Sequence, residues 1–263
     1  MRHIFPRGGG SPGARLGRLD DRVVFVVGSP RSGTTFLGET LGSLPGFVDL
    51  GEVAPLKAAV PRLIGLPDEV IGPQVRRILD RTRRLAFVPG LRGVEQGPET
   101  VYVLPAALRA YPHARAVHIL RDGRDVVCSL LERGWLRAGQ PRWRDEVEHG
   151  GQARFWVEPE RREEFEQASE ATRAAWVWRV YVSRARANTE RMLEIRYERL
   201  TEHPESVSDA LARHLGAPAA VLLDRLDEAH DRSIGRWRRD LTREQLTDVE
   251  REAGPLLAEL GYA

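Results

Sequence analysis

Cysteine and lysine are almost absent from this chain of 263 residues. Cys128 is the only cysteine, which excludes an internal disulfide, and its place in an apolar helical stretch indicates an inert packing role. Lys57 is the only lysine among 40 basic residues, a bias toward arginine that we attribute to coding preference. The seven histidines lie far apart and form no cluster with cysteine, so we expect no bound metal.

Long apolar runs and an excess of one charge are also missing. No stretch is apolar for long enough to span a bilayer, and the first twenty residues are rich in Gly, Pro and Arg without the apolar core of a secretory signal. Net charge is only +2 because acids are interspersed with the basic residues, which excludes the one-signed surface typical of nucleic-acid or membrane binding. We therefore expect a cytoplasmic protein with no nucleic-acid and no membrane partner.

The pattern of apolar residues predicts one α/β domain. Residues 1–20 indicate a flexible arm and residues 21–263 the folded domain, since α/β folds of this length commonly remain single. Short apolar runs predict strands at 23–27, 47–50, 114–120 and 192–197. Helical periodicity predicts helices at 33–44, 68–84, 100–110, 123–134, 166–191, 204–215 and 242–260. Strands that alternate with helices favour a parallel sheet flanked by helices. The unpatterned interval 134–160 predicts a long surface loop.

The first predicted strand leads into a turn marked by glycines. Val23–Val27 is a continuous apolar run typical of a central parallel strand, and Gly28 ends it. Gly33, Thr34 and Thr35 then begin an amphipathic helix whose unpaired N–H groups and positive dipole end can hold an anion. The sequence therefore predicts a P-loop-like sheet with a phosphate site at this turn. The glycine spacing by itself is also compatible with a purely structural turn.

The turn lacks the lysine that a nucleotide phosphate loop carries. The spacing from Gly28 to Gly33 is that of such a loop, but Thr34 stands at the lysine position. That lysine contacts the outer phosphates of a nucleoside triphosphate, so its absence argues against kinase or ATPase chemistry. Arg31, inside the loop, supplies a cation instead.

Residues 29–35 carry a resemblance to a known family. Their order, Ser-Pro-Arg-Ser-Gly-Thr-Thr, is similar to the 5′-phosphosulfate loop of the sulfotransferases that use 3′-phosphoadenosine 5′-phosphosulfate (PAPS), in particular bacterial and tyrosylprotein-type members. The resemblance implies PAPS as the sulfuryl donor and no metal. It also implies a catalytic role for Arg31 on the departing phosphate, and donor binding by Arg31, Ser32, Gly33, Thr34 and Thr35.

A second strand, at 114–120, leads into a helix with polar residues at regular spacing. Arg121 follows the strand at its carboxyl end, where open α/β sheets bind ligands, and Ser129 and Arg133 are four apart and share a helix face. The segment resembles the 3′-phosphate site of the same sulfotransferases, which implies that these three residues bind the donor. The alternative is a solvated helix with local ion pairs to the acidic residues Asp122, Asp125 and Glu132.

A carboxylate follows the second predicted strand. Glu52 comes directly after Gly51, at the end of the strand where a side chain can face the site. Transfer of a sulfuryl group to a hydroxyl needs a base that takes the acceptor's proton. The Gly-Glu pair resembles the position of the catalytic glutamate in tyrosylprotein-type and many bacterial sulfotransferases, which implies that Glu52 is the base. A lone acid here is otherwise a surface group or a helix cap.

Two later segments resemble the adenosine side of the donor site. Residues 193–200 are similar to a family stretch in which a tyrosine lies against the nucleotide, which implies a donor contact for Tyr197. A core aromatic ring with a bonded hydroxyl is the alternative. Residues 233–238 are similar to a C-terminal segment that closes over the donor with a cation, which implies donor contacts for Ser233 and Arg236.

One residue departs from the family pattern. The family commonly has a lysine that approaches the bridging oxygen of the phosphosulfate, and at that place this chain has Gln96. An amide brings no charge, so the leaving phosphate would depend on Arg31, the loop amides and the helix dipole. Lys57 lies five residues beyond Glu52 and is a poor substitute by position.

Taken together, these residues predict a sulfotransferase that moves a sulfuryl group from PAPS to a hydroxyl or phenol of a small-molecule acceptor. One alternative is a P-loop kinase or nucleotide hydrolase, which would depend on magnesium. Another is a catalytically impaired protein that binds PAPS or its product 3′-phosphoadenosine 5′-phosphate (PAP), because of Gln96. The sequence carries no signal for the acceptor's identity or for the oligomeric state.

Overall fold

Five short strands form one parallel sheet, in the order β2-β3-β1-β4-β5, in this computed structural model. The structure describes residues 19–85, 88, 90–137, 155, 157–188, 190–226, 229 and 231–262. β1 (Val24–Val27) lies between β3 (Arg92–Glu95) and β4 (Arg115–Leu120). β2 (Phe47–Gly51) pairs with β3 at one edge, and β5 (Met192–Arg196) pairs with β4 at the other. All the pairings are parallel, so the carboxyl ends of the described strands meet at one edge of the sheet.

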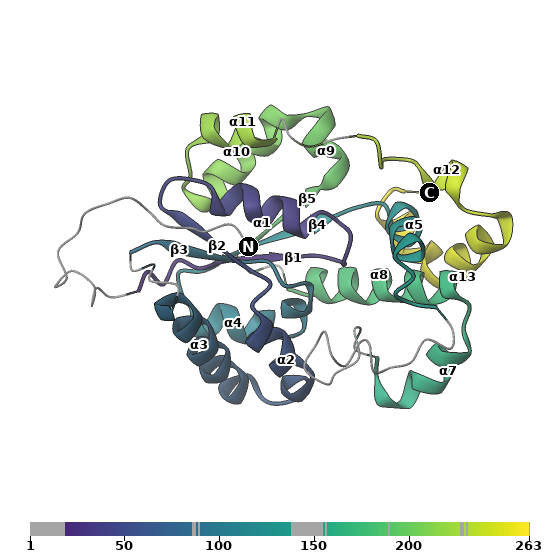
Figure 1. The fold of residues 1–263 in the computed structure, drawn as a ribbon, viewed down its shortest axis with the longest axis horizontal. Helices are drawn as coiled ribbons and strands as arrows, with labels where there is room; N and C mark the ends of the chain where they lie inside the picture. Colours follow the sequence, from purple (N-terminus) through teal and green to yellow (C-terminus); the bar gives the residue numbers. More distant parts are fainter. Residues whose placement is uncertain are drawn as a thin grey trace.

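Helices cover both faces of the sheet and extend beyond its carboxyl edge (Figure 1). The α-helices are α1 (Thr34–Gly42), α2 (Ala54–Leu63), α3 (Asp68–Leu85), α4 (Leu104–Ala110), α5 (Gly123–Arg133), α7 (Arg162–Gln167), α8 (Glu170–Arg186), α9 (Tyr197–Glu202), α10 (Pro204–Leu215), α11 (Ala219–Leu226), α12 (Trp237–Asp240) and α13 (Arg243–Glu259). Two 3₁₀ turns, η2 (Pro98–Tyr102) and η3 (Pro159–Arg161), precede α4 and α7.

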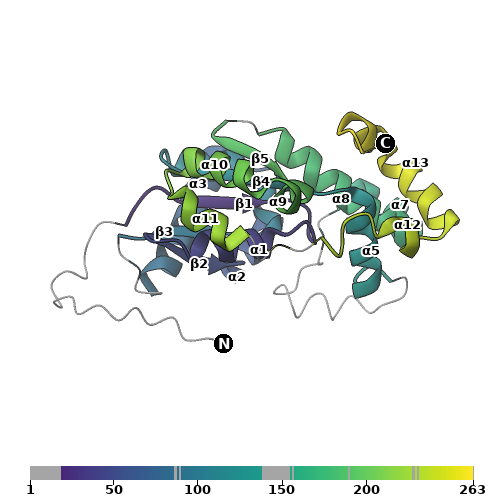
Figure 2. The same ribbon diagram turned by 90° about the horizontal axis from the view of Figure 1, so that it is seen from above.

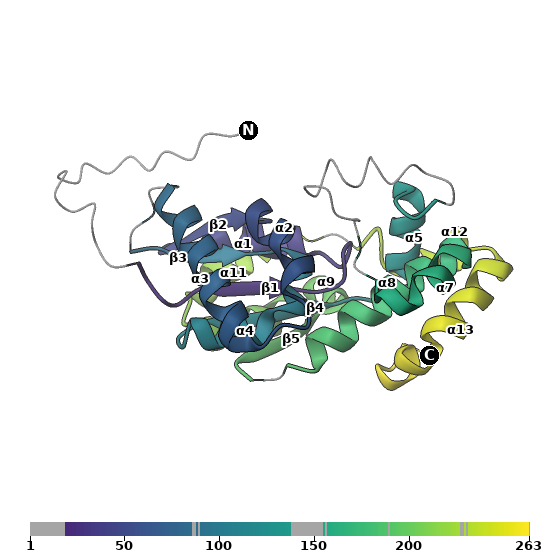
Figure 3. The same cartoon turned by 90° about the horizontal axis from the view of Figure 1, so that it is seen from below.

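Alternate residues of β1 face two separate apolar cores. Val24 and Val26 pack with side chains of α1, α10 and α11, whereas Phe25 and Val27 pack with those of α2, α3 and α4. The two layers are visible from opposite sides: α10 and α11 lie over the strands in Figure 2, and α3 and α4 lie over them in Figure 3. Burial on both faces explains why β1 is a continuous apolar run.

The single α/β domain with a parallel sheet is confirmed, and each of the four predicted strands is present within a residue or two. The sequence missed β3 and the helices α2, α9, α11 and α12. The predicted strand 192–197 was one residue too long, because β5 ends at Arg196 and Tyr197 begins α9.

The predicted helix 166–191 is also wrong as a single element. Two helices, α7 and α8, occupy this region, and Ser169 separates them because its hydroxyl accepts the N–H of Thr172 at 3.1 Å and caps α8. The predicted surface loop 134–160 lies mostly outside the described residues. At its ends Leu136, Phe155 and Val157 are buried in the core, so these parts are not surface.

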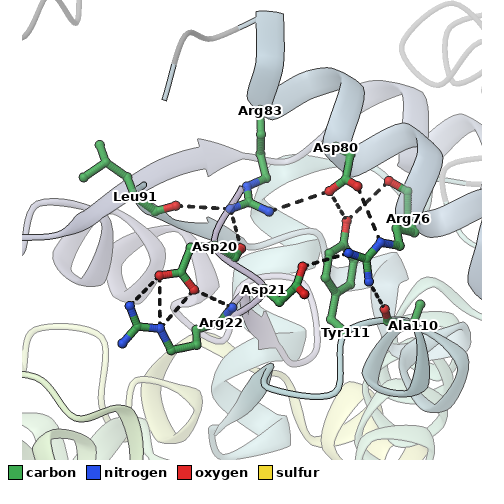
Figure 4. A network of polar contacts seen from close by, with 9 residues as sticks. All are labelled: Asp20, Asp21, Arg22, Arg76, Asp80, Arg83, Leu91, Ala110 and Tyr111. Atoms are coloured by element: carbon green, nitrogen blue, oxygen red, sulfur yellow. Dashed lines mark hydrogen bonds and ion pairs between the residues drawn. The ribbon is translucent and has the colours of Figure 1, made fainter. Parts of the chain in front are cut away.

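A network of arginines ties the amino ends of the strands to α3 (Figure 4). The buried Arg83 donates to the carbonyls of Asp20, at 2.5 Å, and Leu91, at 3.1 Å, just before β1 and β3. Arg76 pairs with Asp21 at 2.7 Å. Packing therefore begins inside the predicted arm 1–20, whose residues 1–18 lie outside the described residues.

Candidate active site

The loop after β1 turns sharply at the carboxyl edge of the sheet. Arg31 and Gly33 both have left-handed backbone conformations, with φ of 71° and 99°. Gly33 caps α1 without a side-chain hydrogen bond, so the first N–H groups of the helix remain available to a ligand. A Cβ atom at Gly33 would lie 2.8 Å from the Tyr197 ring, and one at Gly28 would lie 2.5 Å from the Ile119 carbonyl. The loop therefore requires glycine at both positions.

Two arginines join this loop to the segment after β4. The Arg31 Nε donates to the Ser129 Oγ on α5 at 2.9 Å. The Arg121 guanidinium donates to the Arg31 carbonyl at 3.0 Å and to the Ser233 carbonyl at 2.6 Å. Its carbon lies 4.7 Å from the centre of the Tyr197 ring. Arg31, Arg121 and Ser129, predicted for the two phosphate ends of the donor, thus lie in one cluster with Tyr197 and Ser233, predicted for its adenosine side.

Positive charge is concentrated in this cluster. Burial and, after it, the nearby charges of Arg133 and Arg121 lower the pKa of Arg31 from its ordinary value, and Glu132 opposes the shift. The Ser32 Oγ and the Arg121 Nε are buried and have no hydrogen-bond partner within the described part of the chain. Such groups cost free energy unless a ligand satisfies them, so the cluster is suited to phosphate or sulfate oxygens.

The segment between Ser233 and Trp237 is held over the cluster by Asp125 on α5. The Asp125 carboxylate accepts the N–H of Gly235 at 2.7 Å and of Trp237 at 3.0 Å. The Arg236 guanidinium, expected to face the donor, forms ion pairs with Glu132 at 3.1 Å and Asp240 at 2.6 Å. Its charge is therefore already shared by two carboxylates.

Glu52 lies at the same edge, directly after β2. Its side chain is 41% exposed, and its Oε2 lies 2.7 Å from the Nζ of Lys57 on α2. The same Nζ lies 3.5 Å from Oε1 of Glu99 on η2. A carboxylate that is accessible to solvent and fixed by an ammonium group can accept a proton from a molecule bound at this edge.

Comparison with known proteins identifies the family. The model of the sulfotransferase family matches residues 70–220, which is more than half of the chain. The chain belongs to the sulfotransferase family. Among curated relatives, this sulfotransferase is 28% identical over 127 residues to a putative protein-tyrosine sulfotransferase of Caenorhabditis briggsae. The match covers 43% of this chain and 44% of that protein, so it spans less than half the length of the relative.

Solved structures of other sulfotransferases have the same fold. The sulfotransferase domain of the olefin synthase from Synechococcus PCC 7002 gives a TM-score of 0.53 at 17% identity, over 90% of this chain and 96% of that one. The domain from the curacin biosynthetic pathway gives 0.53 at 17% identity, over 91% and 98%. Mouse sulfotransferase SULT7A1, solved in complex with PAP, gives 0.52 at 14% identity, over 94% and 88%.

Gln96, the departure from the family pattern, is buried beside α1. Its Nε2 lies 3.4 Å from the Asp49 Oδ1, and its Oε1 lies so close to Gly38 that a Cβ atom there would approach it to 2.4 Å. Burial raises the pKa of Asp49, and a hydrogen bond from the Gly51 N–H opposes this. The amide therefore packs between β2 and the body of α1.

The sequence missed two residues that shape the site. Lys57 was considered only as a poor substitute for the family lysine, yet it contacts Glu52. The spacing of five residues across a strand-to-helix turn is compatible with such a contact. Asp125 was considered only as a local ion-pair partner, although it binds the backbone of Gly235 and Trp237.

The described part of the chain has neither a membrane-spanning helix nor a cluster of potential metal ligands. No helix in the described part of the chain is long and apolar enough to cross a membrane. Within the same residues, the structure brings together no group of three His, Cys, Asp or Glu side chains that could hold a metal ion.

Proposed function

We propose that this sulfotransferase moves a sulfuryl group from PAPS to a hydroxyl or phenol group of a small-molecule acceptor. The observation that carries the proposal is the junction between two anion-binding segments, where Arg31 contacts Ser129 and Arg121 contacts the backbone of Arg31. A ligand with phosphate groups on two positions of one ribose would engage both segments. PAPS has this property and ATP does not. The PAP complex of the mouse neighbour supports the same donor class.

In this proposal each end of the donor has its own residues. The 5′-phosphosulfate lies against Arg31 and the N–H groups of Ser32–Thr35, where the Ser32 hydroxyl needs a partner. The 3′-phosphate lies against Arg121, Ser129 and Arg133, where the Arg121 Nε needs one. The nucleoside lies between them.

The remaining predicted donor residues border the nucleoside. Tyr197 packs on the Arg121 guanidinium and against Gly33, so its ring touches both phosphate-binding segments. The Ser233 backbone is bound to Arg121. The Arg236 guanidinium pairs with Glu132 and Asp240, so we assign it the secondary role of holding the segment in place.

The chemical step is an in-line displacement at sulfur. The acceptor oxygen forms a bond to the sulfur atom while the bond between sulfur and the bridging phosphate oxygen breaks, and that oxygen keeps the bonding electrons in PAP. Glu52 takes the acceptor's proton. Arg31 and the loop N–H groups stabilise the negative charge that develops on the departing phosphate. No metal takes part in this step.

The acceptor binds on the side of Glu52. A phenol suits a carboxylate base because its proton is more acidic than that of an aliphatic alcohol. The relative from Caenorhabditis briggsae is described as a protein-tyrosine sulfotransferase, and the tyrosine side chain is itself a phenol. We therefore place phenols first among the acceptors to be tried, in free metabolites and in short tyrosine peptides.

An acceptor screen tests the proposal. Purified protein is incubated with PAPS, without added metal, and with phenols, alcohols and tyrosine peptides, and mass spectrometry follows the gain of one sulfo group. We expect at least one phenol to be sulfated in a single turnover with release of PAP. Tight PAP binding with no sulfation of any acceptor would instead support the catalytically impaired alternative.

A further inference from the structure

Lys57 lies between two carboxylates that belong to different elements. Its Nζ is 2.7 Å from Oε2 of Glu52, in the loop after β2, and 3.5 Å from Oε1 of Glu99, on η2. The Lys57 side chain is only 17% exposed, and that of Glu99 is 11% exposed. The ammonium group thus connects an accessible carboxylate to a buried one.

The buried carboxylate needs this cation. Burial raises the pKa of Glu99, the Lys57 charge lowers it, and the Glu52 charge raises it further. The Glu99 Oε2 has no hydrogen-bond partner within the described residues. If the ammonium group were absent, the buried Glu99 carboxyl group would keep its proton to higher pH, because burial and the nearby Glu52 charge both disfavour its ionised form.

Other ionisable groups pack around the same three residues. The rings of Tyr102 and Tyr181 are in edge contact, with 5.3 Å between their centres. Burial is the main cause of the raised pKa of Tyr181, and the charges of Glu99 and Glu52 raise it further. Arg184 lies 5.4 Å from the Tyr102 ring and 3.8 Å from Glu158. This second cation faces a tyrosine and a different carboxylate. Lys57 is the cation that contacts Glu52 and Glu99 together.

We propose that Lys57 is a positioning residue that fixes Glu52 in place for the acceptor by bridging it to Glu99. The inference rests on the proposed function, in which Glu52 accepts the acceptor's proton. A base that rotates freely performs this step poorly. A compact ammonium group can bind two carboxylates from different directions, whereas a guanidinium group is a planar fork. A lysine at this position is thus an exception with a physical reason in a chain whose other basic residues are arginines.

Three variants test the role of the ammonium group. Lys57→Met removes the charge and keeps a long unbranched side chain. Lys57→Arg restores a charge with a different shape. Arg62→Met removes an exposed cation that donates to the Ala58 carbonyl on the same helix, and serves as the matched control. Circular dichroism confirms that each variant is folded.

The first measurement does not depend on activity. Carbon-detected NMR follows the glutamate carboxyl groups through a pH titration, and Glu99→Gln identifies the Glu99 signal. We expect the Glu99 midpoint to rise by at least about one pH unit in Lys57→Met, the scale of losing an adjacent opposite charge. Lys57→Arg should reverse most of this rise, and Arg62→Met should leave the midpoint where it is in the unaltered protein. An unchanged midpoint in folded Lys57→Met would overturn the inference.

The second measurement is kcat/KM with phenol acceptors of different acidity. We expect Lys57→Met to lower kcat/KM by about tenfold for a weakly acidic phenol, because its base is misplaced, and by less for an acidic phenol that depends less on the base. An equal loss for every phenol would contradict the inference. If the unaltered protein sulfates no acceptor, the proposed function fails, and the NMR titration still decides whether Lys57 forms the bridge.

Discussion

The two ends of the sheet use arginine in opposite ways. At the amino ends, Arg83 is buried against two backbone carbonyls and Asp80, and Arg76 pairs with Asp21 and Asp80 (Figure 4). At the carboxyl ends, Arg31 and Arg121 donate to a hydroxyl and to carbonyls, and neither forms an ion pair within the described residues. The first arrangement neutralises charge with groups of the protein, and the second leaves charge for a ligand.

This difference explains what each end contributes. Opposite charges and hydrogen bonds to backbone carbonyls at the amino ends favour the folded state without any partner. Crowded arginines and a left-handed Arg31 at the carboxyl ends cost stability that a bound anion can return. We therefore expect substitutions at the carboxyl ends to change binding and turnover, and substitutions at the amino ends to change stability.

The largest expected effect is on turnover at the carboxyl end. Glu52→Gln removes the proposed base and should lower kcat by about 10²–10⁴-fold, while the fold and PAP binding are retained. Single-turnover sulfation measures the loss, and Glu69→Gln, an exposed glutamate on α3, is the matched control. The defect should become smaller as the phenol becomes more acidic. An equal defect for acidic and weakly acidic phenols would show that Glu52 is not the base.

The next effect is on stability at the amino end. Arg83→Met leaves the carbonyls of Asp20 and Leu91 without their donor, and should lower the free energy of unfolding by roughly 3 kcal/mol, the scale of breaking a buried charged contact. Denaturant unfolding measures this loss, and Arg77→Met, exposed on the same helix, is the control. PAP affinity of the folded variant should be unchanged. A variant that loses PAP affinity but keeps its stability would break the comparison between the two ends.

Arg121 gives a smaller effect, on binding. Arg121→Ala should weaken PAP binding by roughly 1.5–3 kcal/mol, the scale of a lost charge-assisted hydrogen bond, with little effect on adenosine 5′-phosphate. Calorimetry with both ligands measures the difference, and Arg213→Ala, exposed on α10, is the control. Arg121 also holds the carbonyls of Arg31 and Ser233. Equal losses for the two ligands would therefore indicate a disordered loop and contradict a specific 3′-phosphate contact.

Glu95, at the carboxyl end of β3, is an exception to this division, because its substitution should change stability in a way that depends on pH. Burial raises its pKa from the ordinary 4.5 to about 8, although the Thr100 hydroxyl and the Gly97 N–H both donate to it. The folded protein therefore holds this proton between these pH values when the unfolded chain has lost it. Stability from this group is fully present below pH 4.5, falls as pH rises through the window, and is constant above about pH 8.

The matching variant removes this dependence. The difference in the free energy of unfolding between Glu95→Gln and the unaltered protein should increase as pH rises from 4.5 to about 8. The increase should be at most about 1.4 kcal/mol per pH unit. Denaturant unfolding at several pH values measures the difference between the two proteins. A difference that does not change with pH would show that Glu95 is ionised in the folded state.

The sequence predicted the parts of the molecule whose signals are local. β1 and β4 are continuous apolar runs, and the loop around Arg31 follows a strand at a recognisable glycine spacing. β3 was missed because its four residues include Arg92, Gly93 and Glu95, and it is buried by its neighbours rather than marked by its own composition. The helix α2 was missed because proline occurs at two places in it, and proline is unusual inside a helix.

The contacts between distant segments could not be predicted. The hydrogen bond from Arg31 to Ser129 and the bridge from Lys57 to Glu99 depend on how the sheet brings its carboxyl ends together, which no spacing in the chain records. Arg236 is a further case. The resemblance of residues 233–238 implied a donor contact for Arg236, and the fold also gives it two carboxylate partners that the sequence did not indicate.

We propose that the carboxyl-end arginines form a site for a nucleotide with a 3′-phosphate. Isothermal titration of the purified protein with PAP and with ATP, each with magnesium and with a chelator, tests this site directly. We expect that PAP binds more tightly than ATP and that its affinity is the same without magnesium. Equal affinity for the two nucleotides, or PAP binding that requires magnesium, would contradict it.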